Sequence, residues 1–282
     1  MLGSFEYVRA DSVQAACDLL REGGGEALAY AGGTDLLVEI RNAVRSPKLL
    51  VDLKKIEPLG RIDSTDGSLN IGAAVSLNRV VENAAIRGAL PALSEAAFTI
   101  ATYQLRHRAT LGGNLCNASP ASDSIPPLLV AGASVHIVGP ESERDVPLSA
   151  FCVGVKKTCL ACGEIVSEIR IPPIPEGTRT AFLKQQRIKG HDLAVVNLAG
   201  ALSPSGDLRI AIGSCSPTPL LLEPIETSGH SPDTVADEAV REAMASVSPI
   251  SDVRASAEYR RAVLPALVRR LVARLYDEGR SA

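Results

Sequence analysis

The 282-residue sequence has no tryptophan, few aromatic residues (3%) and no excess of basic charge. Lys and Arg total 29 against 32 Asp and Glu, which gives a formal net charge of −3. A protein that binds nucleic acid normally presents a basic field, and one that binds single strands usually adds aromatic rings for stacking. The composition therefore argues against nucleic acid as a partner.

The sequence also lacks a continuous apolar run of about 18 residues, the length that a membrane-spanning helix needs. Its first residues show neither the basic nor the apolar segment of a secretory signal. The six cysteines are too sparse for a disulfide scaffold in a chain of this length. We expect a cytoplasmic protein with reduced thiols and without a membrane-spanning segment.

Hydrophobic residues make up 46% of the chain, enough for a sizeable core, and the length favours about two structural units. Residues 1–53 alternate between strand-like and helix-like patterns and predict a β-α-β-α-β unit. Residues 172–177, rich in Pro and ending in Gly, read as a linker. Beyond it, three β-rich runs and two amphipathic helices predict a three-stranded antiparallel sheet with helices.

A first glycine-rich segment runs from Ala29 to Leu36 and reads AYAGGTDL. It has the form of a strand, a turn and a helix start. Two residues without Cβ let the backbone approach a ligand closely, and free N–H groups at a helix start suit a phosphate. Any turn between a strand and a helix also favours glycine, so a purely structural turn stays an alternative for this segment alone. The pattern is neither G-x-G-x-x-G nor a P-loop.

A second segment, residues 110–123, reads TLGGNLCNASPASD and repeats the diglycine theme. We expect it to be a loop that ends at a helix. A structureless connection of this length is uncommon in a compact domain and is more often a binding loop. Two such loops on neighbouring sub-domains can hold the pyrophosphate of a dinucleotide between them.

A third block follows the linker: AFLKQQR at 181–187, then DLAVVN at 192–197. The glycine pairs that begin at Gly32 and Gly112 are 80 residues apart. Together the three blocks resemble the FAD-binding (medium) subunits of the molybdenum hydroxylase family, which includes xanthine dehydrogenase and bacterial carbon monoxide dehydrogenase. The resemblance covers essentially the whole chain.

This resemblance implies an α+β fold of the vanillyl-alcohol oxidase/MurB type, with two FAD-binding sub-domains at 1–53 and 54–174. A C-terminal domain with the antiparallel sheet and its helices would occupy 175–282. The cofactor would be FAD. The residues that match the family's FAD contacts are Ala29, Tyr30, Ala31, Gly32, Gly33, Thr34, Asp35, Leu36, Ile100, Thr110, Leu111, Gly112, Gly113, Asn114, Asp123, Val166 and Lys184.

Three of these matches carry a physical expectation. Ile100 and Val166 would supply apolar walls, and Lys184 would place positive charge near the flavin ring, where negative charge accumulates on reduction. Asp35 does not suit a pyrophosphate because a carboxylate repels it. We therefore expect Asp35, with Thr34, to cap the helix that it begins.

Cys159 and Cys162 form a C-x-x-C pair, with Cys116 and Cys152 upstream. Four cysteines could bind a [4Fe–4S] cluster, as in one branch of the family, or zinc. That branch carries its cluster in an inserted loop, whereas the interval from Asp123 to Glu164 has the family's ordinary length. We expect structural thiols and no metal.

The resemblance implies no catalytic acid, base or nucleophile on this chain. A large molybdopterin subunit and a small [2Fe–2S] subunit would complete a heterotrimer, often doubled. Electrons would pass from the clusters to the flavin and on to NAD⁺, O₂ or another acceptor. Two alternatives stay open: a flavin-free scaffolding subunit, and a stand-alone FAD oxidoreductase of the same fold. Neither the substrate of the complex nor its acceptor follows from the sequence.

Overall fold

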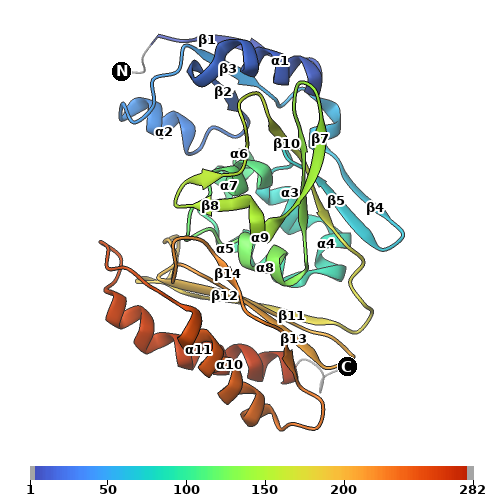
Figure 1. Cartoon of the computed structure of the whole chain (residues 1–282), viewed down its shortest axis with the longest axis vertical. Helices are drawn as coiled ribbons and strands as arrows, with labels where there is room; N and C mark the ends of the chain where they lie inside the picture. Colours follow the sequence, from blue (N-terminus) through green and yellow to red (C-terminus); the bar gives the residue numbers. More distant parts are fainter. Residues whose placement is uncertain (1–3, 278–282) are drawn as a thin grey trace.

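The computed structural model of the chain describes residues 4–277, and its three large β-sheets follow one another along the long axis (Figure 1). The first sheet stands at the N-terminal end and the third at the C-terminal end. The second lies between them with most of the short helices.

The first sheet is parallel, with strand order β1-β3-β2. These strands are β1 (Glu6–Arg9), β2 (Ala27–Tyr30) and β3 (Leu49–Asp52). Helix α1 (Val13–Gly23) connects β1 to β2 and buries its Ala16, Cys17 and Leu20 face. Its apolar residues recur at helical spacing, which is why the sequence predicts it well. The predicted β-α-β-α-β pattern is therefore observed.

Helix α2 (Leu36–Arg41) follows the first diglycine turn. Asp35 occupies its N-cap position with α-helical dihedral angles, and its side chain accepts no capping hydrogen bond. The carboxylate instead accepts a hydrogen bond from Asn117 Nδ2 at 3.2 Å. The expectation that Asp35 caps its own helix is therefore wrong, because its side chain turns toward Asn117 and not back to the backbone of α2.

The second sheet is antiparallel, with strand order β4-β5-β10-β6-β7. Its strands are β4 (Ile62–Thr65), β5 (Ser68–Gly72), β6 (Ser134–Val138), β7 (Glu143–Pro147) and β10 (Ile165–Ile171). The helices of this part are α3 (Leu77–Glu82), α4 (Ala84–Ala89), α5 (Pro91–Thr99), α6 (Tyr103–Arg108), α7 (Leu111–Cys116), α8 (Ile125–Val130) and α9 (Leu148–Phe151). A hairpin of β8 (Cys152–Gly154) and β9 (Lys157–Thr158) precedes β10.

The second glycine-rich segment is not the loop that we expect from its composition. Its first half forms helix α7, for which Thr110 is the N-cap and accepts a hydrogen bond from the Gly113 N–H at 3.0 Å. Leu111 and Leu115 are fully buried, so tertiary packing offsets the low helix propensity of the two glycines.

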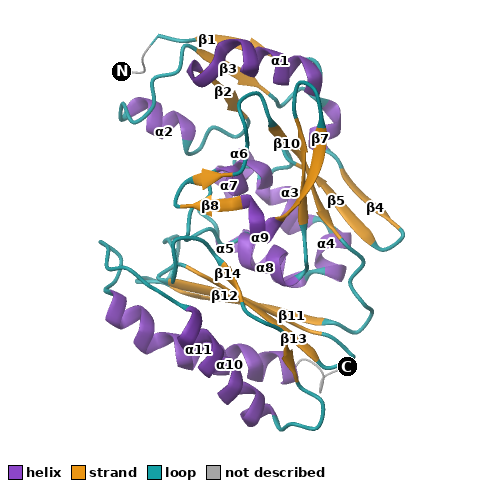
Figure 2. Ribbon diagram, viewed as in Figure 1, coloured by secondary structure: helices purple, strands orange, loops and turns teal. Residues whose placement is uncertain are grey.

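The third sheet contains the three predicted strands, β11 (Arg179–Gln185), β12 (Val196–Leu202) and β13 (Asp207–Gly213), paired antiparallel. Two short strands, β14 (Leu220–Leu221) and β15 (Ile225–Glu226), extend it along β13. Helices α10 (Pro232–Ser246) and α11 (Ala257–Asp277) cover its outer face (Figure 2).

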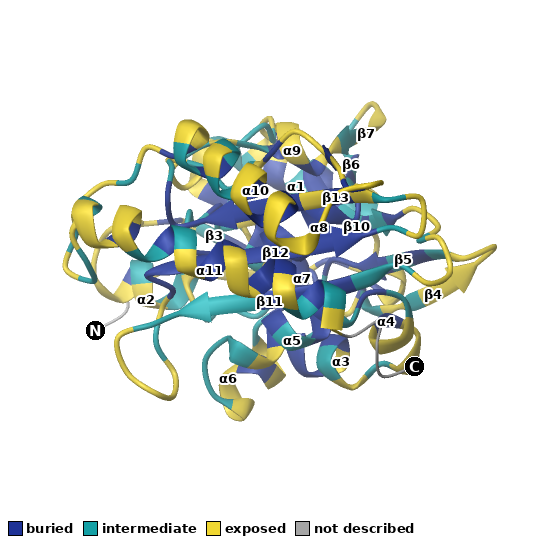
Figure 3. Cartoon of the chain, turned by 90° about the horizontal axis from the view of Figure 1, so that it is seen from below, coloured by how far each residue is buried: buried dark blue, intermediate teal, exposed yellow. Residues whose placement is uncertain are grey.

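All seven residues of β12 are buried, because helices cover both faces of the third sheet. Leu271 and Leu275 of α11 pack on one face of this sheet. Ala199 and Ala201, on the other face, join the hydrophobic core around the second sheet. In the view of Figure 3 the exposed residues of α10 and α11 lie on the outside, over buried strands. Within residues 4–277, no helix combines the length and the apolar character needed to cross a bilayer.

Candidate functional site

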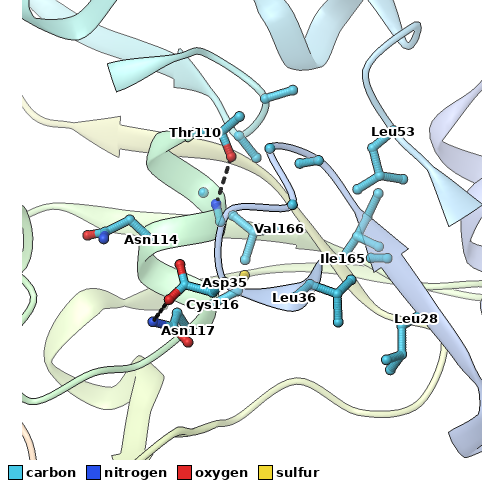
Figure 4. Close-up of a pocket in the computed structure, with 18 of the residues that line it drawn as sticks. Leu28, Asp35, Leu36, Leu53, Thr110, Asn114, Cys116, Asn117, Ile165 and Val166 are labelled. Carbon is cyan, nitrogen blue, oxygen red and sulfur yellow. Dashed lines mark hydrogen bonds between the residues drawn. The ribbon is translucent and has the colours of Figure 1, made fainter. Parts of the chain in front are cut away.

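A cavity of about 270 Å³ lies between the turn that follows β2 and helix α7. Its polar side presents Thr110, Asn114, Asn117 and Asp35, whereas Leu28, Leu36, Leu53 and Ile165 form an apolar side (Figure 4). Val166 lies between the two groups. The cavity thus brings together the two glycine-rich segments, which are 80 residues apart in the sequence.

The first segment offers a row of backbone donors to this cavity. Among the described residues, none of the N–H groups from Gly32 to Leu36 donates a hydrogen bond to another part of the chain. The first N–H after them, that of Leu37, donates to the Gly33 carbonyl at 3.0 Å. Successive N–H groups in a turn with one left-handed residue form a concave anion site, and Gly33 has φ +73°.

The two glycines of this turn are required by the protein itself. A Cβ at Gly32 would overlap the Arg108 carbonyl, and a Cβ at Gly33 would overlap the Tyr30 ring. Sequence reasoning assigns these glycines to close approach of a ligand. The structure adds a second reason, since each lets the turn pack tightly on its own chain.

The second segment differs from the first in its backbone donors. The Leu111 N–H donates to Val75 at 2.9 Å, and the Gly112 N–H donates to Ala73 at 3.0 Å. With the Gly113 N–H bound to Thr110, the start of α7 has no free backbone donor in its first three residues. The first segment therefore supplies the unbonded backbone N–H groups at this cavity, and the second contributes side chains.

Asn114 supplies a side-chain donor from the second segment. Its Oδ1 accepts hydrogen bonds from Ser122 and Ser124, both at 2.6 Å, which fixes the orientation of the amide. Within the described part of the chain, its Nδ2 has no protein acceptor, so this group can donate into the cavity that Asn114 lines. Asn117 instead connects Asp35 to Lys156, whose Nζ donates to Asn117 Oδ1 at 2.5 Å.

A second cavity, of about 590 Å³, opens between α5 and the edge strand β11. Lys184, Thr99 and Phe98 contribute to its wall. The Lys184 ammonium lies 2.7 Å from Asp123 Oδ2 and donates to the Thr99 carbonyl at 3.3 Å. Asn197 Nδ2 donates to the other Asp123 oxygen at 2.6 Å. Burial raises the pKa of Asp123, and the contacts with Lys184 and Asn197 offset only part of that rise.

The segment that contains Ile100 is held by a buried guanidinium. Arg106, 4% exposed, donates from Nη1 to the carbonyls of Phe98, Ile100 and Ala101 at 2.8–3.0 Å. Ala101 has φ +47°, an unusual value for a residue with a Cβ. Arg106 therefore fixes a strained turn, and with it the position of Ile100. The sequence shows only an arginine on a short helix and gives no signal for this role.

The structure places the predicted site residues in three groups. Twelve line the first cavity, namely Ala29, Ala31, Gly32, Gly33, Thr34, Asp35, Leu36, Thr110, Gly112, Gly113, Asn114 and Val166. Lys184 lines the second cavity. Four line neither cavity, namely Tyr30, Ile100, Leu111 and Asp123. Sequence reasoning missed the rim of the first cavity, where Arg45 and Glu39 form an ion pair at 2.9 Å.

Two family models match the chain in succession. Residues 3–174 match the FAD binding domain in molybdopterin dehydrogenase, and residues 181–275 match the CO dehydrogenase flavoprotein C-terminal domain. The chain belongs to the FAD-binding subunits of the molybdopterin dehydrogenases. The predicted family is thereby confirmed, and with it FAD as the cofactor and oxidoreductases as the enzyme class.

Relatives of this family match over nearly the full length. The carbon monoxide dehydrogenase medium chain of Hydrogenophaga pseudoflava is 32% identical over 275 residues, which cover 94% of this chain and 95% of that one. The xanthine dehydrogenase FAD-binding subunit of Escherichia coli O157:H7 is 32% identical over 275 residues and 94% of each chain. A solved carbon monoxide dehydrogenase from H. pseudoflava superposes with a TM-score of 0.93 over 98% of this chain and 99% of that chain, at 30% identity.

The cysteines of this flavoprotein subunit are all free. Cys17 and Cys215 are buried, and burial raises the pKa of each thiol to about 11. In the part of the chain that the structure describes, no group of three or more His, Cys, Asp or Glu side chains is arranged to hold a metal ion.

Proposed function

We propose that the chain is the electron-transfer flavoprotein of a heterotrimeric molybdenum hydroxylase. The observation that carries this proposal is the row of unbonded N–H groups from Gly32 to Leu36 at the edge of the first cavity. A row of backbone donors suits the pyrophosphate of FAD, because it supplies several hydrogen bonds to anionic oxygens without a bulky side chain.

The donor set around that cavity fits this assignment. Asn114 can donate its amide from the opposite side, and the apolar side that includes Leu53 and Ile165 suits the uncharged parts of the cofactor. Asp35, the only acidic residue among the predicted contacts in this cavity, is bound by Asn117. That contact lessens its repulsion of a phosphate.

We assign the ring end of FAD to the region of Lys184, Asp123 and Ile100. The flavin supplies the redox chemistry when it is bound, since it takes up and releases electrons. Lys184 and Asp123 hold a fixed dipole there, and the turn clamped by Arg106 presents Ile100. The other predicted site residues, Tyr30 excepted, and the divisions at 53/54 and 174/175 are part of this proposal.

We infer the partners from the relatives. Those relatives are named as a medium chain, an FAD-binding subunit, and the subunit alpha of a 6-hydroxypseudooxynicotine dehydrogenase complex from Paenarthrobacter nicotinovorans, 32% identical over 289 residues. We propose a large molybdopterin subunit and a small [2Fe–2S] subunit, in a single or doubled heterotrimer in the cytoplasm. Electrons would enter the flavin from the clusters and leave to an external acceptor.

A visible spectrum of the purified 282-residue chain tests cofactor binding. We expect flavin absorption bands and close to one FAD per chain after release by heat. A colourless protein that does not take up added FAD would contradict the proposal and favour a flavin-free scaffold.

Co-purification tests the subunit assignment. We expect an affinity-tagged chain, expressed with its genomic neighbours, to recover two partners that contain molybdenum and iron. A chain that stays alone and turns over a substrate with FAD would instead favour a stand-alone oxidoreductase.

A further inference from the structure

The carboxyl ends of the three parallel strands bring Arg9, Asp52 and Tyr30 into one row. Arg9 lies opposite Asp52 in the pairing of β1 with β3, and Tyr30 lies opposite Asp52 in the pairing of β2 with β3. This edge is where parallel sheets place their ligand sites. The first diglycine turn leaves the sheet there.

Asp52 is the anchor of this row. Its side chain is only 2% exposed and accepts hydrogen bonds from Tyr7 Oη and from Lys54, at 2.6 Å from Nζ and 2.9 Å from the backbone N–H. Arg9 Nε lies 4.0 Å from it. A buried carboxylate with these donors stays ionised and fixes the Lys54 ammonium in one place.

The fixed ammonium lies over an aromatic ring. Lys54 Nζ is 3.9 Å from the centre of the Tyr30 ring, a cation–π contact, and the Tyr7 ring meets Tyr30 edge to face at 6.1 Å. Tyr30 is thus held on one side by a cation and on another by a second ring.

The held ring lies against the turn. A Cβ built on Gly33 would overlap the Tyr30 ring, so the ring lies directly beside the residue whose φ is +73°. Ala29 and Ala31, the neighbours of Tyr30 in the sequence, line the first cavity. Tyr30 and Lys54 do not line it. The ring therefore faces the back of the turn, away from the space that a ligand would occupy.

We propose that Tyr30 and Lys54 are positioning residues that hold the Gly32–Gly33 turn in its donor-presenting shape, and that Tyr30 does not contact FAD itself. This inference rests on the proposed function, since it concerns the shape of the same turn. The sequence leads us to expect that Tyr30 contacts FAD directly. We instead assign Tyr30 the role of packing against the Gly32–Gly33 turn on the side away from the cavity.

The test uses the full chain, stripped of flavin and titrated with FAD, with the melting temperature of the apoprotein measured in parallel. The variants are Tyr30→Leu and Lys54→Met, the conservative pair Tyr30→Phe and Lys54→Arg, and the control Lys48→Met. Lys48 directly precedes β3, and its ammonium pairs with the Glu26 carboxylate at 2.9 Å. This ion pair therefore lies at the opposite edge of the sheet.

We expect Tyr30→Leu and Lys54→Met each to raise the dissociation constant of FAD by about tenfold, the scale of a cation–π contact between partly buried groups. Tyr30→Phe, Lys54→Arg and Lys48→Met should stay within about twofold, since arginine also stacks on aromatic rings. The double variant Tyr30→Leu/Lys54→Met should lose little more than either single variant, because the two residues act as one unit.

Four results would overturn the inference, the last of them together with the proposed function. Unchanged affinity in Lys54→Met together with loss in Tyr30→Leu would show that the ring contacts FAD directly. A loss in Tyr30→Phe would show the same for its hydroxyl. A weaker affinity that follows the melting temperature in every variant, and that Lys54→Arg does not restore, would show a general folding defect. A wild-type chain without FAD binding would overturn the proposed function and this inference with it.

Discussion

The Lys184 ammonium and the Asp123 carboxylate lie 2.7 Å apart, and each side chain is only 5% exposed. The positive charge that the sequence leads us to expect near the flavin is therefore paired inside the protein. A buried pair costs desolvation energy, and removal of one partner leaves the other charge uncompensated. The pair, rather than the lysine alone, determines the local field.

The first prediction concerns this pair. Lys184→Met should destabilise the folded chain by about 3–5 kcal/mol, measured by urea unfolding. It should change the flavin midpoint potential little, because burial already raises the pKa of Asp123 and its carboxyl would take up a proton once the lysine is gone. Asp123→Asn leaves the lysine unpaired and should raise the potential by about 30 mV, since a cation favours the reduced anionic ring.

A spectroscopic redox titration of both variants checks this, with Lys189→Met, an exposed lysine beyond β11, as the control. Shifts of equal size and opposite sign in the two variants would show that Lys184 acts as an independent charge.

The second prediction separates the glycines. Gly33→Ala should lower the free energy of unfolding by about 1–2 kcal/mol, because alanine is strained at φ +73° and meets the Tyr30 ring. It should also reduce FAD content, since the strained turn presents the donors. Gly25→Ala is the matched control, as a Cβ there meets no atom within 4 Å. Equal flavin content and equal stability in both variants would refute the role of the turn.

The third prediction is a pH dependence. Burial by itself raises the pKa of Asp52, but hydrogen bonds from Lys54 and Tyr7 more than offset it, and the net pKa lies below its usual 3.8. A carboxyl with a lower pKa in the folded state contributes stability above pH 3.8 that is lost as the pH falls through the lowered value. Asp52→Asn should therefore cost about 1–3 kcal/mol at pH 7, and the difference from wild type should shrink below about pH 4.

Urea midpoints at pH 7, 5 and 3 measure this difference. The exposed Asp63 of β4 provides the control, because Asp63→Asn should change stability by less than about 0.5 kcal/mol at each pH. A difference between Asp52→Asn and wild type that stays constant down to pH 3 would speak against an ionised anchor.

The fourth prediction concerns the cysteines. Iodoacetamide at pH 8 should modify the exposed Cys162 well before Cys17 and Cys215, whose thiols are buried and have a pKa of about 11. Peptide mapping over time gives the order. Protection of Cys162 together with about four irons per purified chain would indicate a cluster in place of free thiols.

The sequence predicts those parts of the fold that depend on local patterns. Helix α1 has clear apolar periodicity, and the three long strands of the third sheet follow a clear change in composition. By contrast, β7 has the sequence ERDVP and is mostly exposed, so it shows no alternation and takes its place only through pairing with β6. Helix α7 is missed because Gly112 and Gly113 disfavour a helix that tertiary contacts then impose.

The site residues also divide into those that a local sequence pattern predicts and those that it does not. Motif spacing identifies the residues around Gly32 and Asn114, because they belong to short contiguous segments. The contacts that support the site join residues from different segments: Arg106 with Phe98, Asp123 with Lys184 and Asn197, and Tyr30 with Lys54. No single-sequence pattern connects such pairs. Ordinary residues on ordinary elements therefore gain their roles only in three dimensions.

The buried strand β12 has a consequence for how the molecule unfolds. One face of the third sheet completes the hydrophobic core around the second sheet, and the other face packs under α10 and α11. The segments on either side of the linker at 172–177 therefore share one hydrophobic core. A chain cut at this linker would expose the apolar surface of Phe182, Ala199 and Ala211 on one fragment, and the residues that cover it on the other. The segments that contain the second and third sheets should therefore unfold in a single cooperative transition. Neither fragment should stay monomeric when it is expressed alone.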